Sequence, residues 1–202
     1  MGAKARLAGV VVIALGMLFL LLSQTMAQRS GDIPYTDATF QISQDSTKVV
    51  LQVITSGSAL GRISTITLCG DGLIEFEKRE RGRILEEYTA TANIGSAGVH
   101  DLMRVAVSHG LPEWDSSTIM AWMRQKRPST LKVTDGGQIY VALTLERYQR
   151  GVFEKTDHAV SFKANAYDKH AEFYPEIKQF QGIVKIADRL FEEWRIARGP
   201  KE

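Results

Sequence analysis

Hydrophobic and polar positions alternate along the first half of the chain after its N-terminal segment. Alternation with a period of two, or a run rich in β-branched residues, is typical of strands in a sheet with one buried face. The turn signal Gly70-Asp71-Gly72 suits a hairpin, because glycine adopts positive φ at little cost. A second turn signal lies at 81–83, and a further strand is expected at 84–90. The pattern predicts an antiparallel meander whose first three strands occupy 48–55, 64–69 and 73–79.

The pattern then changes to helical spacing. Ser96 is a candidate N-cap, and Gly110 and Pro112 are stop signals for the helix that follows. A short second helix is expected within 113–129. The apolar positions that carry these two helices are Val99, Leu102, Met103 and Ala106 in the first, and Ile119, Trp122 and Met123 in the second.

The second half repeats the order of hairpin and helix. Residues 130–151 combine an alternating strand, an Asp-Gly turn and another strand, and 158–166 supply one more strand. In the strand after the turn, Ile139, Val141, Leu143 and Leu145 are expected on one face, and Tyr140, Thr144, Glu146 and Tyr148 on the other. Residues 175–198 form a long amphipathic helix with Pro175 in its first turn.

These elements predict an α+β fold, with an antiparallel sheet of about six to seven strands and helices packed on one face. The two hairpin–helix units suggest an internal duplication, in which Cys69 corresponds to Thr134.

The N-terminus predicts export. Two positive charges precede the apolar run Leu7–Leu22, and Thr25 and Ala27 suit a cleavage site for a signal peptidase. The alternative is an uncleaved membrane anchor over residues 7–27. We expect a signal peptide or anchor at 1–27, a linker or loosely docked arm at 28–47, one domain at 48–198 and a tail at 199–202, with a periplasmic, extracellular or membrane-anchored location.

Composition and charge argue against several classes of function. The chain has 202 residues, of which 44% are hydrophobic and 24% charged, as in folded domains. Lys4 and Arg6 account for the formal charge of +2, so the remainder is neutral and gives no electrostatic reason to bind nucleic acid. A single cysteine forms no internal disulfide. No phosphate-binding loop or dinucleotide fingerprint occurs, and we expect no cofactor.

The order of features resembles an uncharacterised family of exported bacterial domains built from two sheet-plus-helix units with GDG-type turns. The matching pieces, within 48–194, are "TLCGDGLIEFE", "HDLMRVAVSHGL", "STLKVTDGG" and "IADRLFEEW". The chain departs from this family where many members have a "CFGTCP"-like segment, because it has "SGSALGR" there. The resemblance implies a fold and export, and it carries over no catalytic residue.

Two enzyme-like or metal-binding interpretations remain open. Cys69, paired with His100, would be the nucleophile of a thiol-dependent or other hydrolase, although the hairpin signal next to Cys69 favours a structural role. Asp168, His170 and Glu172 would share one face if their segment were a strand, and they would then offer mixed nitrogen and oxygen ligands to a metal. The simpler interpretation of that segment is a solvated polar edge.

The leading hypothesis is a non-enzymatic envelope or extracellular binding module. Its partner would be an envelope or extracellular protein, or another ligand, bound at the open face of the sheet or at the loop 112–128. Aromatic residues are favoured at interfaces because they combine apolar area with a polar group. The candidates for partner contact are Trp114, Trp122, Tyr140 and Tyr148.

Overall fold

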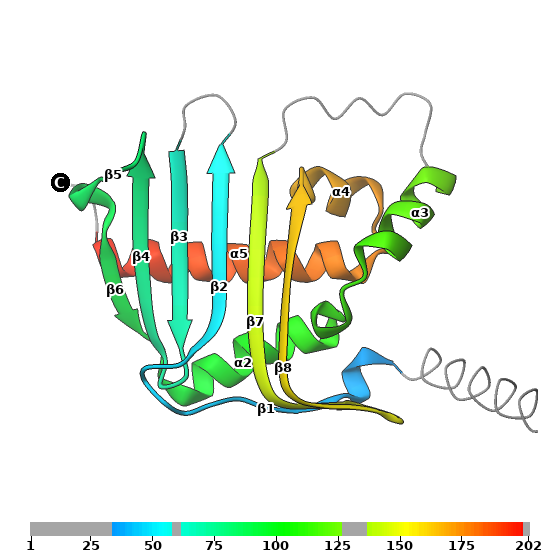
Figure 1. Cartoon of the computed structure of the whole chain (residues 1–202). Coiled ribbons are helices and arrows are strands. Elements are labelled where there is room, and N and C mark those ends of the chain that lie inside the picture. Colours follow the sequence, from blue (N-terminus) through cyan, green and yellow to red (C-terminus); the bar gives the residue numbers. More distant parts are fainter. Residues whose placement is uncertain (1–33, 58–61, 127–136, 200–202) are drawn as a thin grey trace, which may run out of the picture.

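The computed structural model describes residues 34–57, 62–126 and 137–199 (Figure 1). Its elements follow in the order η1 (Tyr35–Asp37), β1 (Thr39–Gln41), β2 (Val49–Gly57), β3 (Arg62–Cys69), β4 (Leu73–Glu80), β5 (Arg83–Ile84), η2 (Glu86–Tyr88), β6 (Ala90–Asn93), α2 (Gly95–Ser108), η3 (Leu111–Glu113), α3 (Ser116–Lys126), β7 (Gln138–Arg150), β8 (Phe153–Asn165), α4 (Tyr167–Phe173) and α5 (Lys178–Arg198).

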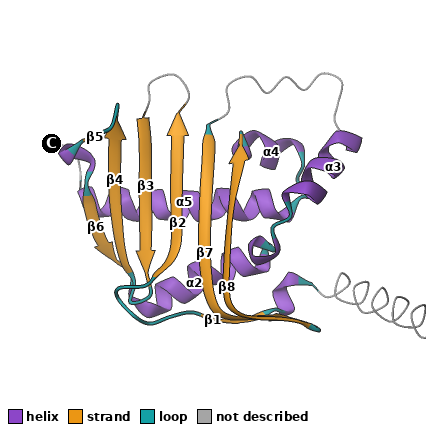
Figure 2. Ribbon diagram, viewed as in Figure 1, coloured by secondary structure: helices purple, strands orange, loops and turns teal. Residues whose placement is uncertain are grey.

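One antiparallel sheet of eight strands forms the first layer, and the helices form the second (Figure 2). The strand order is β1-β7-β2-β3-β4-β5, with β6 paired to β4 and β8 paired to β7. The predicted α+β class, with helices on one face of the sheet, is confirmed. The suggested duplication is not confirmed, because most of the second Asp-Gly turn lies outside the described residues.

A row of apolar side chains crosses the sheet on the face that the helices cover. The register pairs these residues strand by strand, and each is at most 5% exposed: Phe162, Val141, Val53, Ile66 and Phe76. Burying large apolar side chains contributes roughly 1.5–3 kcal/mol each. This row explains why strands predicted from local alternation pair in this register, since a slip of one residue would turn every apolar side chain to solvent.

The helices α2 and α5 bury apolar stripes against this row. Their buried residues are Val99, Leu102, Met103, Ala106 and Val107 in α2, and Phe180, Gly182, Ile183, Ile186, Ala187 and Leu190 in α5. The expected cap of α2 at Ser96 is wrong, because α2 begins at Gly95 with Ile94 as its N-cap; the side chain of Asn93 accepts a hydrogen bond from the N–H of Gly95 at 2.8 Å. Helix α5 begins at Lys178, so Pro175 precedes its first turn.

The segment expected as a linker takes part in the fold over its described residues. Strand β1 pairs with the far half of β7, where Phe40 faces Tyr148. Ile42 is buried. The folded unit therefore begins before Lys48, at η1, and residues 28–33 lie outside the described part. The pairing joins segments about 100 positions apart, which no local pattern reports.

The prediction that Tyr148 lies on the face opposite the buried residues of its strand is also wrong. Odd positions of β7 face the core up to Leu145, but Tyr148 and Arg150 are buried further along the strand. The change coincides with Asp157 of β8, which lies between the paired residues Thr156 and His158 and has a φ of 48°. The pairing register is the same on both sides of Asp157, and the side chains of Tyr148 and Arg150 both donate hydrogen bonds to Glu113 of η3.

The expected strand at 84–90 is also broken up, into the short strand β5, η2 and the start of β6. The predicted N-terminal signal or anchor lies outside the described residues. Within the part that the structure describes, no helix has the length and apolar character to cross a membrane.

Candidate functional site

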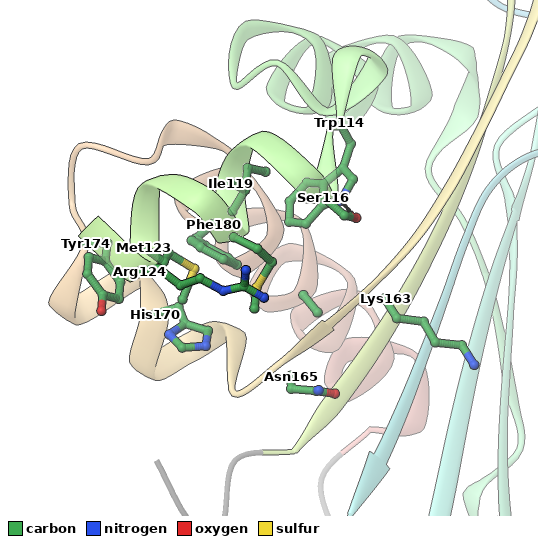
Figure 3. Close-up of a pocket in the computed structure, with 12 residues that line it drawn as sticks. Trp114, Ser116, Ile119, Met123, Arg124, Lys163, Asn165, His170, Tyr174 and Phe180 are labelled. Atoms are coloured by element: carbon green, nitrogen blue, oxygen red, sulfur yellow. Dashed lines mark hydrogen bonds between the residues drawn. The ribbon is translucent and has the colours of Figure 1, made fainter. Parts of the chain in front are cut away.

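A pocket of about 330 Å³ opens between α3, α4, the start of α5 and the end of β8 (Figure 3). This volume lies at the low end of the range for small-molecule sites. Most of the side chains around it are apolar or aromatic, namely Trp114, Ile119, Met120, Met123, Ala164, Tyr174 and Phe180. The polar lining residues are Ser116, Arg124, Lys163, Asn165 and His170.

Helix α3 forms one wall, and Asp115 fixes where it begins. The carboxylate of Asp115 accepts hydrogen bonds from the N–H of Ser117 at 2.9 Å and from the hydroxyls of Ser117 and Thr118, both at 2.6 Å. These bonds lower the pKa of Asp115 to about 2, the Ser117 hydroxyl contributing most. An ionised carboxylate at a helix start satisfies otherwise unpaired N–H groups. The motif "DSST" therefore places the inward-facing residues Ile119 and Met123.

Trp114 anchors the pocket to the sheet. Its ring stacks on Phe162 of β8 with centroids 4.0 Å apart, and it meets Phe180 of α5 edge-on at 5.8 Å. Its indole N–H donates to the hydroxyl of Ser116 at 2.8 Å. The ring is therefore held by contacts with two aromatic residues and at its polar atom, which gives the pocket a rigid wall.

Two basic residues line the pocket, but only one of them is aimed into it. In Figure 3 the side chain of Arg124 runs toward the middle of the pocket, whereas that of Lys163 runs away from the other lining residues. The strand explains the direction of Lys163, because its neighbours Phe162 and Ala164 are buried on the helix side.

His170 of α4 lies at the base of this pocket. Its ring packs 5.2 Å from Phe180 and 5.9 Å from Tyr174. Burial lowers the pKa of His170 against the opposing charge of Asp168, so the ring is neutral at pH 7. Its Nδ1 is buried with no hydrogen-bond partner among the described residues, which costs stability.

The segment that contains Asp168, His170 and Glu172 is a helix, so the condition under which they would share one face, a strand, is not met. In α4, residues two apart point about 200° away from each other, so the three side chains do not share a face. Glu172 instead pairs with Lys169 at 3.4 Å. Within residues 34–57, 62–126 and 137–199, no group of three or more His, Cys, Asp or Glu side chains is arranged to hold a metal ion.

Cys69 and His100 have separate surroundings. No hydrogen bond joins them in the described part of the chain; His100 stacks on Phe40 at 4.8 Å, and its Nδ1 lies 3.1 Å from Arg104. Cys69 ends β3 and is 8% exposed. Burial, followed by the nearby charges of Glu75 and Asp71, raises the pKa of its thiol. A catalytic thiol needs the opposite shift.

We therefore expect the Cys69 thiol to react slowly with iodoacetamide at pH 8. In the folded protein the rate should be roughly tenfold or more below that in denaturant, because thiolate formation and access are both suppressed. Mass spectrometry of the alkylated protein over time measures both rates. Fast alkylation of the folded protein, with a midpoint below the pKa of a free thiol, would contradict this and return Cys69 to the list of nucleophiles.

A second cluster of perturbed groups joins η1, η3 and β7. Arg150 donates two hydrogen bonds to the carboxylate of Glu113, at 2.7 and 2.5 Å, and the hydroxyl of Tyr148 donates a third at 2.6 Å. The guanidinium of Arg150 lies 4.6 Å from the ring centre of Tyr35. Nearby, the Nε2 of His158 lies 2.7 Å from the carbonyl oxygen of Pro112. Because Glu113 is fully engaged within the fold, we interpret this cluster as structural.

The four aromatic residues expected at a partner surface lie in four different settings. Trp114 lines the pocket, and Trp122 is half-buried with its ring edge-on to Tyr174 at 5.9 Å. Tyr140 lies in a shallow hollow on the uncovered face of the sheet. Tyr148 is 0% exposed and offers nothing to a partner.

Sequence reasoning missed the pocket itself. Arg124, Tyr174 and Phe180 were not recognised as one set, because they come from α3, from the turn before α5 and from α5. The only local signal was the half-apolar helix within 113–129, whose Met120 remains 48% exposed.

Comparison with known proteins gives no assignment. No protein-family model matches the chain, and no curated protein matches it.

Proposed function

We propose that this chain is an exported, non-enzymatic binding module, and that the pocket between α3, α4, α5 and β8 holds the apolar part of its ligand. The observation that carries the proposal is a preformed pocket with a rigid aromatic wall and few polar groups, which is the usual composition of a ligand site. Export is supported by the charged, apolar and small-residue order of residues 1–27.

Two further features support binding rather than packing as the role of this region. Met120 leaves about half of its apolar surface exposed at the pocket. The Nδ1 of His170 has no hydrogen-bond partner among the described residues, whereas most buried polar atoms in folded proteins are paired. Departures of this kind from optimal stability are expected at functional sites.

Catalysis has less support in the described part of the pocket. No carboxylate lines it, and its one hydroxyl from serine already accepts the Trp114 indole N–H. The histidine has no hydrogen-bonded nucleophile or orienting carboxylate beside it among the residues described. These are the relations that general acid–base or nucleophilic chemistry requires.

Two alanines of β8 offer a matched test of the pocket. Ala164 lines it and is buried, whereas Ala159 is exposed on the same strand. We expect Ala164→Ile to fill the pocket and weaken ligand binding roughly tenfold or more, while Ala159→Ile leaves affinity unchanged. Both substitutions suit a strand. Isothermal titration with small apolar ligands measures affinity, and thermal unfolding confirms that both variants fold.

Equal affinities for the two folded variants would place binding elsewhere on the protein. Absence of binding to the unmodified protein by apolar ligands of the pocket's size would overturn the proposed function.

A further inference from the structure

We infer that the ligand of this pocket is a small monoanionic carboxylate with an apolar body, its carboxylate bound by Arg124 and its body packed against Trp114 and Phe180. The inference rests on the proposed function and adds the chemical class of the ligand.

The charges around the pocket favour an anion. None of the described residues that line it is acidic, and Arg124 forms no ion pair with any residue in the described ranges. In contrast, six other arginines of the described chain do pair with carboxylates, at positions 79, 104, 147, 150, 189 and 195. An arginine aimed into an apolar pocket without a carboxylate beside it is available to a ligand that brings one.

The number of cations at the pocket indicates which anionic group the ligand carries. Arginine presents parallel N–H donors that match a carboxylate in a two-bond arrangement. Among the described lining residues, Arg124, which is exposed to solvent, is the one cation aimed at the pocket, since Lys163 points away and burial lowers the pKa of His170. One positive charge suits a carboxylate better than a phosphate dianion, which commonly requires several cationic or N–H donors.

The lining residues indicate the size and shape of the apolar part of the ligand. The Trp114 ring is fixed by its stacking on Phe162, and Phe180 and Ile119 add further apolar surface to the lining. A volume of about 330 Å³ corresponds to roughly ten non-hydrogen atoms, at ~30 Å³ for each water-sized atom. The matching ligands are medium-chain fatty acids and small aromatic acids.

A structural role for Arg124 has to be distinguished from its proposed role in binding a carboxylate. Arg124 lies in the last turn of α3, where a cation interacts favourably with the helix dipole. Lys126 lies in the same turn but does not line the pocket; its ammonium lies 6.0 Å from the ring centre of Trp122. Lys126→Gln is therefore the matched control for Arg124→Gln, because both remove one charge from the same helix end.

The experiment uses the chain as an expression host processes it, with the N-terminus identified by intact mass. Six compounds are titrated calorimetrically. Each carries one of two apolar groups, octyl or 3-phenylpropyl, and one of three head groups, a carboxylate, a primary amide or an amine. We expect the carboxylates to bind tenfold or more tightly than the amides, and the amines to bind least, because a charge-assisted hydrogen bond is lost and then a repulsion is added. Arg124→Gln should remove the preference for carboxylate, and Lys126→Gln should retain it.

The outcomes separate the two proposals. Binding of all three head groups with equal affinity, weakened by Ala164→Ile, would overturn the carboxylate assignment and leave the pocket as a binding site. A carboxylate preference that survives Arg124→Gln would overturn the role of Arg124 in binding the carboxylate. No binding by any of the six compounds would overturn both proposals. Retained folding of each variant is checked by its thermal unfolding midpoint.

Discussion

Replacing Glu113 with glutamine is expected to lower the free energy of unfolding by about 3 kcal/mol or more. The side chains of Glu113 and Arg150 are only 16% and 7% exposed, and the substitution removes the carboxylate that accepts two hydrogen bonds from Arg150 and one from Tyr148. Removing one partner of a buried ion pair typically costs 3–5 kcal/mol, because the other charge stays in a poorly solvated place. Equilibrium unfolding in urea measures the change.

The β7–β8 hairpin, to which Arg150 belongs, also contains an exposed ion pair that serves as a control. Arg147 and Glu154 also form a salt bridge between β7 and β8, but their side chains are 48% and 46% exposed. Glu154→Gln should therefore cost less than about 1 kcal/mol. The double variant Glu113→Leu with Arg150→Met should be more stable than Glu113→Gln alone, since it leaves no charge behind. Equal losses for the Glu113 and Glu154 variants would show that burial does not set the strength of the inner pair.

The buried pair also sets the direction of the pH dependence. Burial opposes ionisation of Glu113, but the hydrogen bonds from Arg150 and Tyr148 and the charges of Arg150 and His158 outweigh it, so its pKa in the folded state is lowered. Its stabilisation is therefore fully present above the pKa of an unfolded glutamate, about 4.3, and is lost as the pH falls through the lower folded value. Glu113→Gln should flatten this part of the stability profile between pH 7 and acid.

Replacing Gly72 with alanine is expected to destabilise the fold by about 3 kcal/mol or more. A Cβ at Gly72 would lie 2.5 Å from the backbone nitrogen of Gly95, at the start of α2, and φ at Gly72 is +99°. Backbone strain of this kind costs about 1–3 kcal/mol, and overpacking against backbone adds a similar amount. The unfolding midpoint in urea, with an unchanged slope, would report the loss.

A substitution at Gly82 distinguishes the cost of backbone strain from the cost of a steric clash. It also has a positive φ, +82°, but a Cβ there would meet nothing within 4 Å. Gly82→Ala should therefore cost only the backbone term, about 1–2 kcal/mol. If the two glycine variants lost the same stability, the close approach of the β3–β4 turn to α2 would not be the reason for Gly72.

The strands and helices were largely predictable, because their signals are local. Alternation around Ile66 and Ile74, and helical spacing around Met103, each report a face that must be buried by some other element. The failures occurred where the backbone leaves its regular path. The alternation of β7 changes phase after Leu145, near the left-handed residue Asp157 of β8, and the polar run after Asn165 forms a helix although its spacing also suited a strand edge.

The candidate site was less predictable than the fold. Trp114 was singled out as an aromatic residue for partner contact, and the structure places it in the pocket wall. The roles of Arg124 and Phe180 were not visible, since a basic residue at a helix end and a phenylalanine in an apolar stripe are each explained without a pocket. Only their meeting around one space makes them a candidate site.

Local sequence patterns were sufficient for the α+β class, the hairpin at Gly72 and the positions of α2, α3 and α5, because a chain's periodicity and its turn residues act over a few neighbouring residues. The tertiary structure alone decided the pairing of β1 with β7, the ion pair of Glu113 with Arg150, and the pocket that contains Arg124. These contacts join segments that are far apart in the chain. Their partners are selected by how the layers pack, and no window of the sequence contains both sides of the contact.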